Sequence, residues 1–413
     1  MNHRLLLLSN GHGEDLSGAL LGQALLQRGI GVEALPLVGR GEAYRKAGLA
    51  VLGSGRDFST GGLGYTSLGG RLTELREGQY LDVLRRLARL AERRHNLIVA
   101  VGDVLPVVAA WLSRRPVVVY LVAYSSHYEG KLRLPWPCGA LLRRPRFRRI
   151  WSRDALTGDD LSRQLNRPVT FLGNPFLDPV APEPGGIAST PISGAAQQRL
   201  AVLPGSRLPE AERNLALMLQ VLALLPEPLQ QPQRLALQAA LVGDLDRLAV
   251  ERLAAPLGWR LEPGQGEPDG QATSVLRRGS LRLQLHWGRF PAVLRGCDLA
   301  LSMTGTAAEQ AVGLGKPVLQ LEGGGPQFTA GFAEAQRRLL GPGVLCAPAG
   351  SGHDAASARL AAALLQRLDD PLQGRVWREE LAELGAQRIG RPGGSDRMAE
   401  AIMELLPALQ PAG

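Results

Sequence analysis

Glycines and polar side chains gather in a turn near the start of the chain, after a short apolar run. The turn reads Ser9-Asn-Gly-His-Gly-Glu-Asp15. Gly11 and Gly13 permit tight backbone geometry, and the imidazole of His12 is suited to act as a general base. The G-x-G-x-x-G fingerprint of dinucleotide-binding proteins is absent. A simpler interpretation is a glycine turn in which Asp15 caps the next helix.

A single carboxylate, Asp103, follows a second apolar run in the first half of the chain. Its surroundings read Val101-Gly-Asp-Val-Leu105. A carboxylate just past a buried strand is well placed to orient a substrate hydroxyl or to accept its proton. The alternative is that Asp103 serves only as a helix cap.

The third turn, Leu203-Pro-Gly-Ser-Arg-Leu-Pro209, lies in the second half of the chain. Ser206 is predicted to cap the helix that follows, and Pro209 fits the first helical turn. Arg207 is not needed for either task. Beside a helix N-terminus, which attracts anions, a guanidinium adds bidentate recognition of phosphate or carboxylate.

The fourth turn reads Ser302-Met-Thr-Gly-Thr-Ala-Ala-Glu-Gln310. Thr306 and Glu309 have the spacing of a capping box, which would give Glu309 a structural task. Gly305 allows a ligand to approach the backbone closely, and Thr304 and Thr306 offer hydroxyls. The turn therefore suits a phosphate group at the start of a helix.

Short apolar runs alternate with longer helical patterns, which is typical of parallel sheets. Strands are predicted in the first half at Arg4–Ser9, Gly31–Leu37, Asn96–Val101, Pro116–Val122, Arg149–Ser152 and Val169–Leu172. Strands are predicted in the second half at Arg199–Leu203, Leu235–Val242, Leu281–His286, Leu299–Met303 and Pro317–Leu321. Leucines at helical spacing predict helices at Leu16–Arg28 and Tyr80–Arg93.

These patterns predict an α/β protein with two Rossmann-like lobes whose parallel sheets face each other across a cleft, where such sheets bind ligands. We expect an N-terminal lobe over 1–178, a linker rich in Pro, Gly and Ser over 179–197, a C-terminal lobe over 198–371, and a helical segment over 372–413 that reaches back to the first lobe. The glycine-rich stretch Gly53–Gly70 is either an acceptor-binding loop or a flexible crossover.

Composition excludes several classes of protein. Of the 413 residues, 45% are hydrophobic and 21% charged, which is ordinary for a soluble globular protein. No apolar run is long enough to span a bilayer, and Leu5–Leu8 is too short for a signal peptide. The three cysteines, Cys138, Cys297 and Cys346, match neither a disulfide framework nor a zinc site, so we expect a cytoplasmic protein and no bound metal.

The net charge of +9 is concentrated in one segment, residues 131–153, which holds eight basic residues and no acid. Among them lies the apolar stretch Leu134–Leu142, which contains Trp136. Basic residues beside exposed apolar ones suit an anionic membrane surface. The alternative is that the segment is a solvated basic loop. Nucleic-acid binding is a third interpretation, but no RNA- or DNA-binding motif accompanies the charge.

The turns resemble, in order, motifs of the lipid-A-disaccharide synthases. The run Leu203-Pro-Gly-Ser-Arg207 is similar to their LPGSR motif, Thr304-Gly-Thr-Ala-Ala308 to SGTA, and Gly173-Asn-Pro-Phe-Leu-Asp178 to GHPxxD. Asp15-Leu-Ser-Gly-Ala19 is similar to the end of GExSGDxxGA, and Leu63–Leu75 to their acceptor-side segment. The resemblance runs from residue 9 to about residue 320.

The resemblance implies a GT-B fold and an inverting glycosyltransferase that uses a UDP-sugar without a metal. It implies that Arg207, Thr304, Gly305 and Thr306 surround the donor diphosphate, and we expect Ser206, next to Arg207, to contact it as well. It makes Asp103 the acceptor-side catalytic carboxylate. From the first turn we predict that Gly11, Gly13 and Asp15 bind substrate, and His12 is the other candidate base. The lipid or lipid-linked acceptor would arrive at a cytoplasmic membrane face, with the protein peripherally attached.

The chain departs from the family pattern at three places. A histidine, His12, is inserted in the first turn, and Gln310 stands where a carboxylate near the donor ribose is expected. The stretch Gly323–Thr329 is unlike the basic segment of the family. Two other functions therefore stay open: a UDP-N-acetylhexosamine 2-epimerase, which would turn over the donor alone, and a non-catalytic nucleotide-sugar- or lipid-binding relative.

Overall fold

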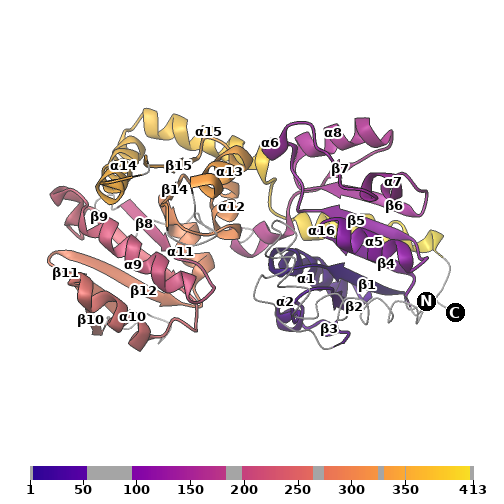
Figure 1. The fold of residues 1–413 in the computed structure, drawn as a ribbon, viewed down its shortest axis with the longest axis horizontal. Coiled ribbons are helices and arrows are strands. Elements are labelled where there is room, and N and C mark those ends of the chain that lie inside the picture. The colour runs from indigo at the N-terminus through magenta and orange to yellow at the C-terminus, as the bar shows by residue number, and fades with distance from the viewer. Residues whose placement is uncertain are drawn as a thin grey trace. The chain divides into compact units, whose positions relative to one another are not determined.

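The computed structural model describes residues 3–53, 95–182, 198–263, 274–323, 330–348 and 350–409. They belong to two compact units, Met1–Asp178 with Gly390–Gly413 and Pro179–Ile389 (Figure 1). The predicted helix at Tyr80–Arg93, all of Gly53–Gly70 except Gly53 itself, the acceptor-side segment Leu63–Leu75 and most of the predicted linker lie outside the described residues.

A seven-stranded parallel sheet in the order β3-β2-β1-β4-β5-β6-β7 forms the centre of the first unit. Its strands are β1 Arg4–Ser9, β2 Gly31–Pro36, β3 Ala50–Val51, β4 Leu97–Val101, β5 Val117–Leu121, β6 Phe147–Ser152 and β7 Thr170–Phe171. The four leucines of β1 are buried because helices cover both faces of the sheet, which is why the strand is a continuous apolar run.

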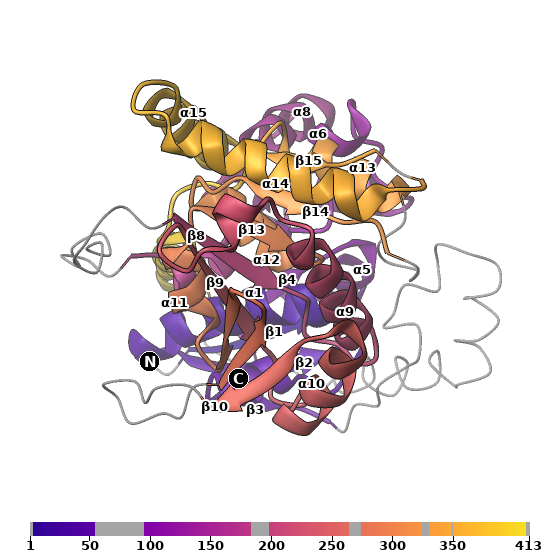
Figure 2. The ribbon, with the colours of Figure 1, turned by 90° about the vertical axis from the view of Figure 1, so that its left-hand side faces the viewer.

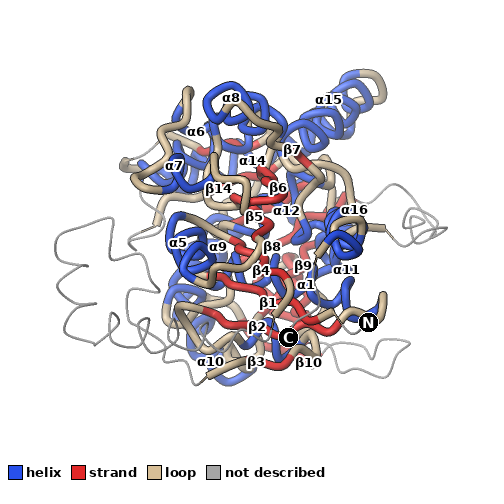
Figure 3. Tube along the Cα trace, turned by 90° about the vertical axis from the view of Figure 1, so that its right-hand side faces the viewer, coloured by secondary structure: helices blue, strands red, loops and turns tan. Residues whose placement is uncertain are grey.

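Helices on both faces complete the first unit. They are α1 His12–Gln27, α2 Glu42–Lys46, α5 Val104–Leu112, α6 Ser126–Glu129, α7 Cys138–Leu142, α8 Ala155–Leu165 and α16 Gly394–Met403, with 3₁₀ turns η3 Pro175–Val180 and η6 Leu406–Ala408. Figure 3 shows α5 on one side of the strands and α16 on the other. Helix α16 packs against α1, and the guanidinium of Arg28, the C-cap residue of α1, lies 2.8 Å from the carboxylate of Asp396. The return of the C-terminal helix to the first lobe is therefore confirmed.

The second unit contains an eight-stranded mixed sheet in the order β10-β11-β12-β9-β8-β13-β14-β15. Its strands are β8 Gln198–Leu203, β9 Leu235–Leu241, β10 Arg260–Pro263, β11 Ser274–Arg278, β12 Leu281–Trp287, β13 Leu299–Ser302, β14 Val318–Gln320 and β15 Val344–Cys346. The pairings β10–β11 and β11–β12 are antiparallel and the others are parallel. The sequence did not lead us to expect this antiparallel edge.

The helices of the second unit again lie on both faces of its sheet. They are α9 Glu210–Ala223, α10 Arg247–Ala254, α11 Phe290–Gly296, α12 Thr306–Gly313, α13 Ala330–Leu340, α14 His353–Asp369 and α15 Gln373–Arg388, with 3₁₀ turns η4 Glu227–Gln230 and η5 Ala255–Leu257. Figure 2 shows α9 and α10 on one side of β8 and β9, with α11 on the other. Helix α15 packs on α12 and α14, so the segment 372–413 is divided between the two units.

Each sheet has one point where the strand order reverses. In the first unit the chain moves outward from β1 through β2 to β3, then returns to place β4 on the other side of β1. In the second unit β8 and β13 are the corresponding neighbours. Open α/β sheets bind ligands beyond the carboxyl ends of the strands at such switch points. Two α/β lobes, one with a parallel sheet and one whose sheet is parallel except at the β10–β11–β12 edge, confirm the predicted fold class. They direct attention to the turns after β1, β4, β8 and β13.

Candidate functional site

The turns after β1 and β4 lie side by side because Ser9 pairs with Val101 in the parallel ladder. Gly102 occupies this junction with φ +135°, and a Cβ added there would lie 2.2 Å from Oδ1 of Asn10. Only glycine fits such an approach without movement of Asn10. The predicted first turn and Asp103 are thus brought together at the switch point.

Asp103 is buried and is the N-cap of α5, where its Oδ1 accepts a hydrogen bond of 2.8 Å from the backbone N–H of Leu105. Burial raises the pKa of Asp103, while hydrogen bonds from Leu105 and from the Asn10 side chain act in the opposite direction. The cap that we considered as an alternative is therefore present. A carboxylate with a raised pKa is also a better general base near neutral pH, so the cap does not remove the catalytic prediction.

Helix α1 begins at His12, with Gly11 as its N-cap and no side-chain capping hydrogen bond. The expectation that Asp15 caps this helix is wrong. Asp15 is buried and instead accepts a hydrogen bond of 2.6 Å from the Ser9 hydroxyl, which in turn accepts one of 2.7 Å from Tyr44. Burial, reinforced by the nearby charge of Asp15, raises the pKa of the Tyr44 phenol well above its usual value.

Gly13 lies in the first turn of α1, and a Cβ added there would meet nothing within 4 Å among the described residues. The helix start therefore has open space at this position. Backbone N–H groups at a helix start with open space beside them suit an anionic or polar ligand.

The turns after β8 and β13 are also neighbours, since Leu203 pairs with Ser302. Asn214 on α9 is buried and joins them: its Nδ2 donates to the carbonyl of Pro204 at 2.8 Å and to that of Met303 at 3.5 Å. This side chain holds the two turns in one arrangement. Asn214 was missed by sequence reasoning, because a helical asparagine in sequence gives no sign of its partners.

Ser206 and Arg207 are exposed in the turn after β8. The prediction that Ser206 caps the helix is wrong, because α9 begins only at Glu210, after Pro209. The main chain of Arg207 is nevertheless tied to α9, as its carbonyl accepts a hydrogen bond of 2.8 Å from Ala211. The guanidinium thus extends into solvent from a fixed backbone.

The prediction of a capping box formed by Thr306 and Glu309 is also wrong. Gly305 takes the N-cap position, so Thr306 is already the first residue of α12, and no side chain caps this helix. The hydroxyl of Thr304 forms a hydrogen bond of 2.7 Å with that of Ser302. Gln310 is buried while Glu309 is half-buried. The start of α12 therefore presents backbone N–H groups that a bound phosphate can use.

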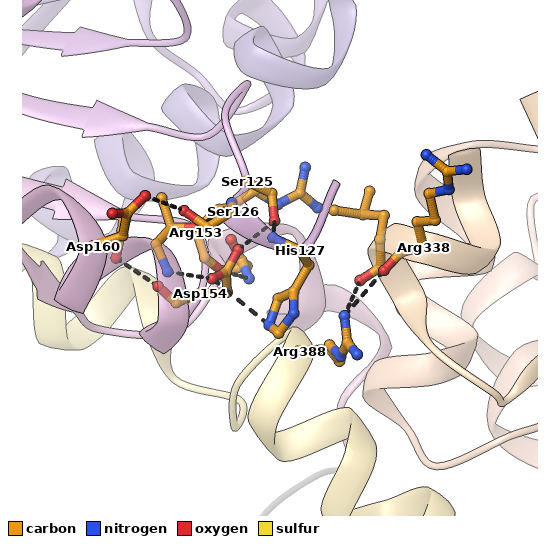
Figure 4. Close-up of polar contacts among 12 residues, drawn as sticks. Ser125, Ser126, His127, Arg153, Asp154, Asp160, Arg338 and Arg388 are labelled. Atoms are coloured by element: carbon orange, nitrogen blue, oxygen red, sulfur yellow. Dashed lines mark hydrogen bonds and ion pairs between the residues drawn. The ribbon is translucent and has the colours of Figure 1, made fainter. Parts of the chain in front are cut away.

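A polar cluster at the ends of β5 and β6, shown in Figure 4, was not predicted. Asp154 is fully buried, caps α8 through Thr157, and accepts a hydrogen bond of 2.7 Å from Ser125; His127 lies 3.8 Å away. In a hydrolytic triad the imidazole stands between hydroxyl and carboxylate. Here the hydroxyl donates directly to the carboxylate, so this cluster positions loops rather than activating a nucleophile. Its sequence signal was the polar run after each strand.

The basic segment 131–153 is only partly exposed. Cys138 and Leu142 on α7 are buried in the core of the first unit, contrary to the expectation of an exposed apolar stretch. Trp136 is 90% exposed. No helix within the described ranges is both long and apolar enough to cross a membrane. Nor do three or more His, Cys, Asp or Glu side chains among those residues gather so that they could hold a metal ion.

Comparison with known proteins gives a sequence similarity and a fold similarity. No protein-family model matches the chain. Lipid-A-disaccharide synthases from Alkalilimnicola ehrlichii and Geobacter sulfurreducens are 28% and 25% identical to it over 259 and 248 residues, in each case 58% of this chain. The matched region spans only 59% and 58% of those two proteins.

Among solved structures, the calicheamicin glycosyltransferase matches with a TM-score of 0.60 at 16% identity, covering 98% of both chains. A UDP-GlcNAc 2-epimerase from Neisseria meningitidis bound to UDP-GlcNAc matches with a TM-score of 0.52 at 14% identity, covering 98% of this chain and 100% of the other. In sequence the chain is similar to, and divergent from, the lipid-A-disaccharide synthases, and its fold is the GT-B fold of glycosyltransferases.

Proposed function

We propose that the protein is an inverting glycosyltransferase that moves a hexose or N-acetylhexosamine-type sugar from a UDP-sugar to a lipid or lipid-linked acceptor at a cytoplasmic membrane face. The observation that carries this proposal is the sequence similarity to lipid-A-disaccharide synthases. The residues that resemble the motifs of that family follow β1, β8 and β13, next to the switch points where α/β sheets bind ligands.

The donor diphosphate binds to the two turns that Asn214 joins. The exposed guanidinium of Arg207 and the hydroxyls of Ser206, Thr304 and Thr306 contact its oxygens, together with the N–H groups at the start of α12. Negative charge grows on the departing UDP as the sugar leaves. Donors fixed in advance stabilise this charge more in the transition state than in the ground state, which accelerates the reaction. No metal is required by this arrangement.

The acceptor hydroxyl is activated in the first unit. Its oxygen attacks the anomeric carbon from the side opposite UDP, the bond to the β-phosphate oxygen breaks with its electron pair leaving on UDP, and the hydroxyl proton passes to Asp103. Gly11, Gly13 and Asp15 contribute to the substrate side of this turn. His12 is the competing base, and separate replacement of the two residues distinguishes them.

A turnover assay with a panel of UDP-sugars, with and without total membrane lipid, tests the proposal by mass spectrometry. We expect a sugar to appear on a lipid only when both are present. UDP bound tightly with no product under any condition would contradict the transferase and favour a binding protein.

A 2-epimerase is the second candidate, because the structure bound to UDP-GlcNAc named above shares the fold over nearly the whole chain. An epimerase converts the donor without lipid. The same assay therefore identifies it by a change in the sugar configuration in the lipid-free arm.

A further inference from the structure

A pocket of about 570 Å³ lies in the first unit, and none of its lining residues belongs to the turns after β1 and β4. It is formed by α6, the segment after it and α8, and its lining includes Ser126, Lys131, Leu156, Asp160, Arg163 and Gln164. None of these residues has a task in the transfer reaction proposed above, so the pocket calls for an explanation of its own.

Buried Asp160 organises the pocket wall. Its Oδ2 accepts hydrogen bonds from the Ser126 hydroxyl at 2.9 Å and from the Leu132 backbone N–H at 2.7 Å, and its Oδ1 accepts one from Gln164 at 3.0 Å (Figure 4 shows the contact with Ser126). Gln164 also donates to the carbonyl of Leu132 at 2.9 Å. Both polar groups of the Leu132 peptide backbone are thus held by α8, which fixes the position of the preceding residue, Lys131.

The charge of the wall favours an anion. Burial alone would raise the pKa of Asp160, but the hydrogen bonds from Leu132, Gln164 and Ser126, with the charge of Arg163, lower it overall. Its carboxylate is therefore ionised at neutral pH and directed at these donors. Lys131 and Arg163 are exposed on the same lining, and within the described ranges Lys131 makes no ion pair or hydrogen bond. Lys131 and Arg163 carry two positive charges against the one negative charge of Asp160, so the lining has a net charge of +1.

One exposed apolar side chain lines the pocket with these cations, and two others lie close to Lys131 in sequence. Leu156, which lines the pocket, is 43% exposed, and Tyr128 on α6 is 48% exposed. Trp136 follows Lys131 by five residues, at most ~18 Å of extended chain, and is 90% exposed. Cations that flank a cavity next to exposed leucine and tryptophan match the boundary between phospholipid headgroups and acyl chains.

We propose that this pocket binds the phosphate of an anionic phospholipid headgroup, with Lys131 and Arg163 on the phosphate and Leu156 and Trp136 against the acyl region. The proposal deepens the membrane attachment included in the proposed function. In this proposal the membrane is bound at a defined headgroup site and not only through the overall charge of a basic segment. Asp160 and Gln164 hold that site in place.

Flotation with phosphatidylcholine vesicles, with and without phosphatidylglycerol, tests the proposal on the full chain without any UDP-sugar. The variant is Lys131→Gln with Arg163→Gln. The matched control is Arg148→Gln with Arg149→Gln, which removes two exposed charges from β6 in the same segment but outside the pocket lining. Loss of charge alone weakens binding by roughly fivefold per residue in both double variants.

We expect the pocket variant to lose phosphatidylglycerol-dependent binding at least tenfold more than the control does. Soluble glycerol phosphate should compete with vesicles for the unmodified protein but leave the residual binding of the pocket variant unchanged. Equal losses in the two double variants would mean that the segment attracts membranes only through net charge, and the headgroup site would be wrong. Unchanged binding in both would also overturn it.

Thermal denaturation and UDP affinity of the same variants provide the remaining controls. Because both replaced side chains are exposed, we expect the melting temperature to be unaltered. If the two double variants lose vesicle binding equally while UDP affinity is unchanged, only the headgroup pocket is rejected. If neither the unmodified protein nor any variant turns over a UDP-sugar, the transferase is rejected and the vesicle result still stands.

Discussion

The carboxylate of Asp178 accepts a hydrogen bond of 2.9 Å from the backbone N–H of Ser395, 217 residues further along the chain. The same carboxylate accepts hydrogen bonds from Gly393 at 2.7 Å and Gly394 at 3.2 Å, so it receives three successive N–H groups at the start of α16. Asp178 ends the run that resembles the GHPxxD motif. In this protein that run has a structural task, because it fixes the last helix to the first unit.

Replacing Asp178 with alanine should therefore destabilise the first unit. Helix-capping carboxylates typically contribute about 1–2 kcal/mol, and the loss leaves three N–H groups without an acceptor. We expect a lower melting temperature in calorimetry and faster proteolysis near residue 390. Asp178→Asn retains one acceptor oxygen and should lose less; equal stability of all three proteins would contradict the capping role.

Asp103→Asn should separate activity from stability. As a general base its loss should reduce transfer by roughly 10²–10⁴-fold, while asparagine still caps α5. Because burial raises the pKa of Asp103 in the folded state, the folded protein binds this proton more tightly than the unfolded chain does. Stability from this group is thus present at low pH and is lost as pH rises through the raised pKa.

At neutral pH the ionised carboxylate therefore costs stability, and the asparagine variant should melt at the same temperature or higher. For the unmodified enzyme, kcat/KM should fall as pH is lowered through the raised pKa of Asp103, because the base becomes protonated. A variant that retains full turnover would shift the role of base to His12, which His12→Asn tests in the same assay.

Arg207 should govern donor affinity. Arg207→Gln removes a charged hydrogen-bonding group worth about 1.5–3 kcal/mol, so UDP affinity measured by calorimetry should fall by roughly 10- to 150-fold. Arg207→Lys keeps the charge but not the bidentate geometry and should restore only part of it. Arg213, exposed in the first turn of α9, supplies the control. An equal effect of Arg213→Gln would indicate that only the overall charge matters.

Two glycines near the first switch point should respond in opposite ways to alanine. Gly102→Ala forces a Cβ toward Asn10 at φ +135° and should cost about 1–3 kcal/mol. Gly13→Ala adds a methyl to open space within a helix and should stabilise by about 0.5–1 kcal/mol. If a substrate approaches Gly13, the same methyl should raise KM. Unchanged kinetics would remove Gly13 from the substrate turn.

Strands β1 and β5 were predictable because they are buried along nearly their whole length and are therefore continuous apolar runs, whereas β12 was predictable because buried leucines alternate with exposed polar residues along it. Strands β1, β5, β9 and β12 lie within one or two residues of their predicted ranges. The antiparallel edge was missed because β11 is half-exposed and polar. The residues Gly279-Ser280, which join β11 to β12 with Gly279 at φ +60°, were the available hairpin signal.

Helix starts were less predictable than strands. At α12 the spacing of Thr306 and Glu309 fits a capping box, yet Gly305 takes the cap position, and at α9 the helix starts after Pro209 rather than at Ser206. Each of these helices follows a strand that fixes the direction of the chain. The position at which the helix begins therefore depends on that strand and not only on the local sequence pattern. Asn214 and Asp178 act across long sequence separations, which no local pattern reports.

Because α16 belongs to the first unit, the chain leaves that unit after Asp178 and re-enters it at Gly390. During synthesis on the ribosome, the first unit therefore lacks helix α16 until the segment after Ile389 has emerged. The second unit, Pro179–Ile389, is complete earlier. The unit whose synthesis starts first is thus the last to acquire its full set of contacts when the chain folds during synthesis.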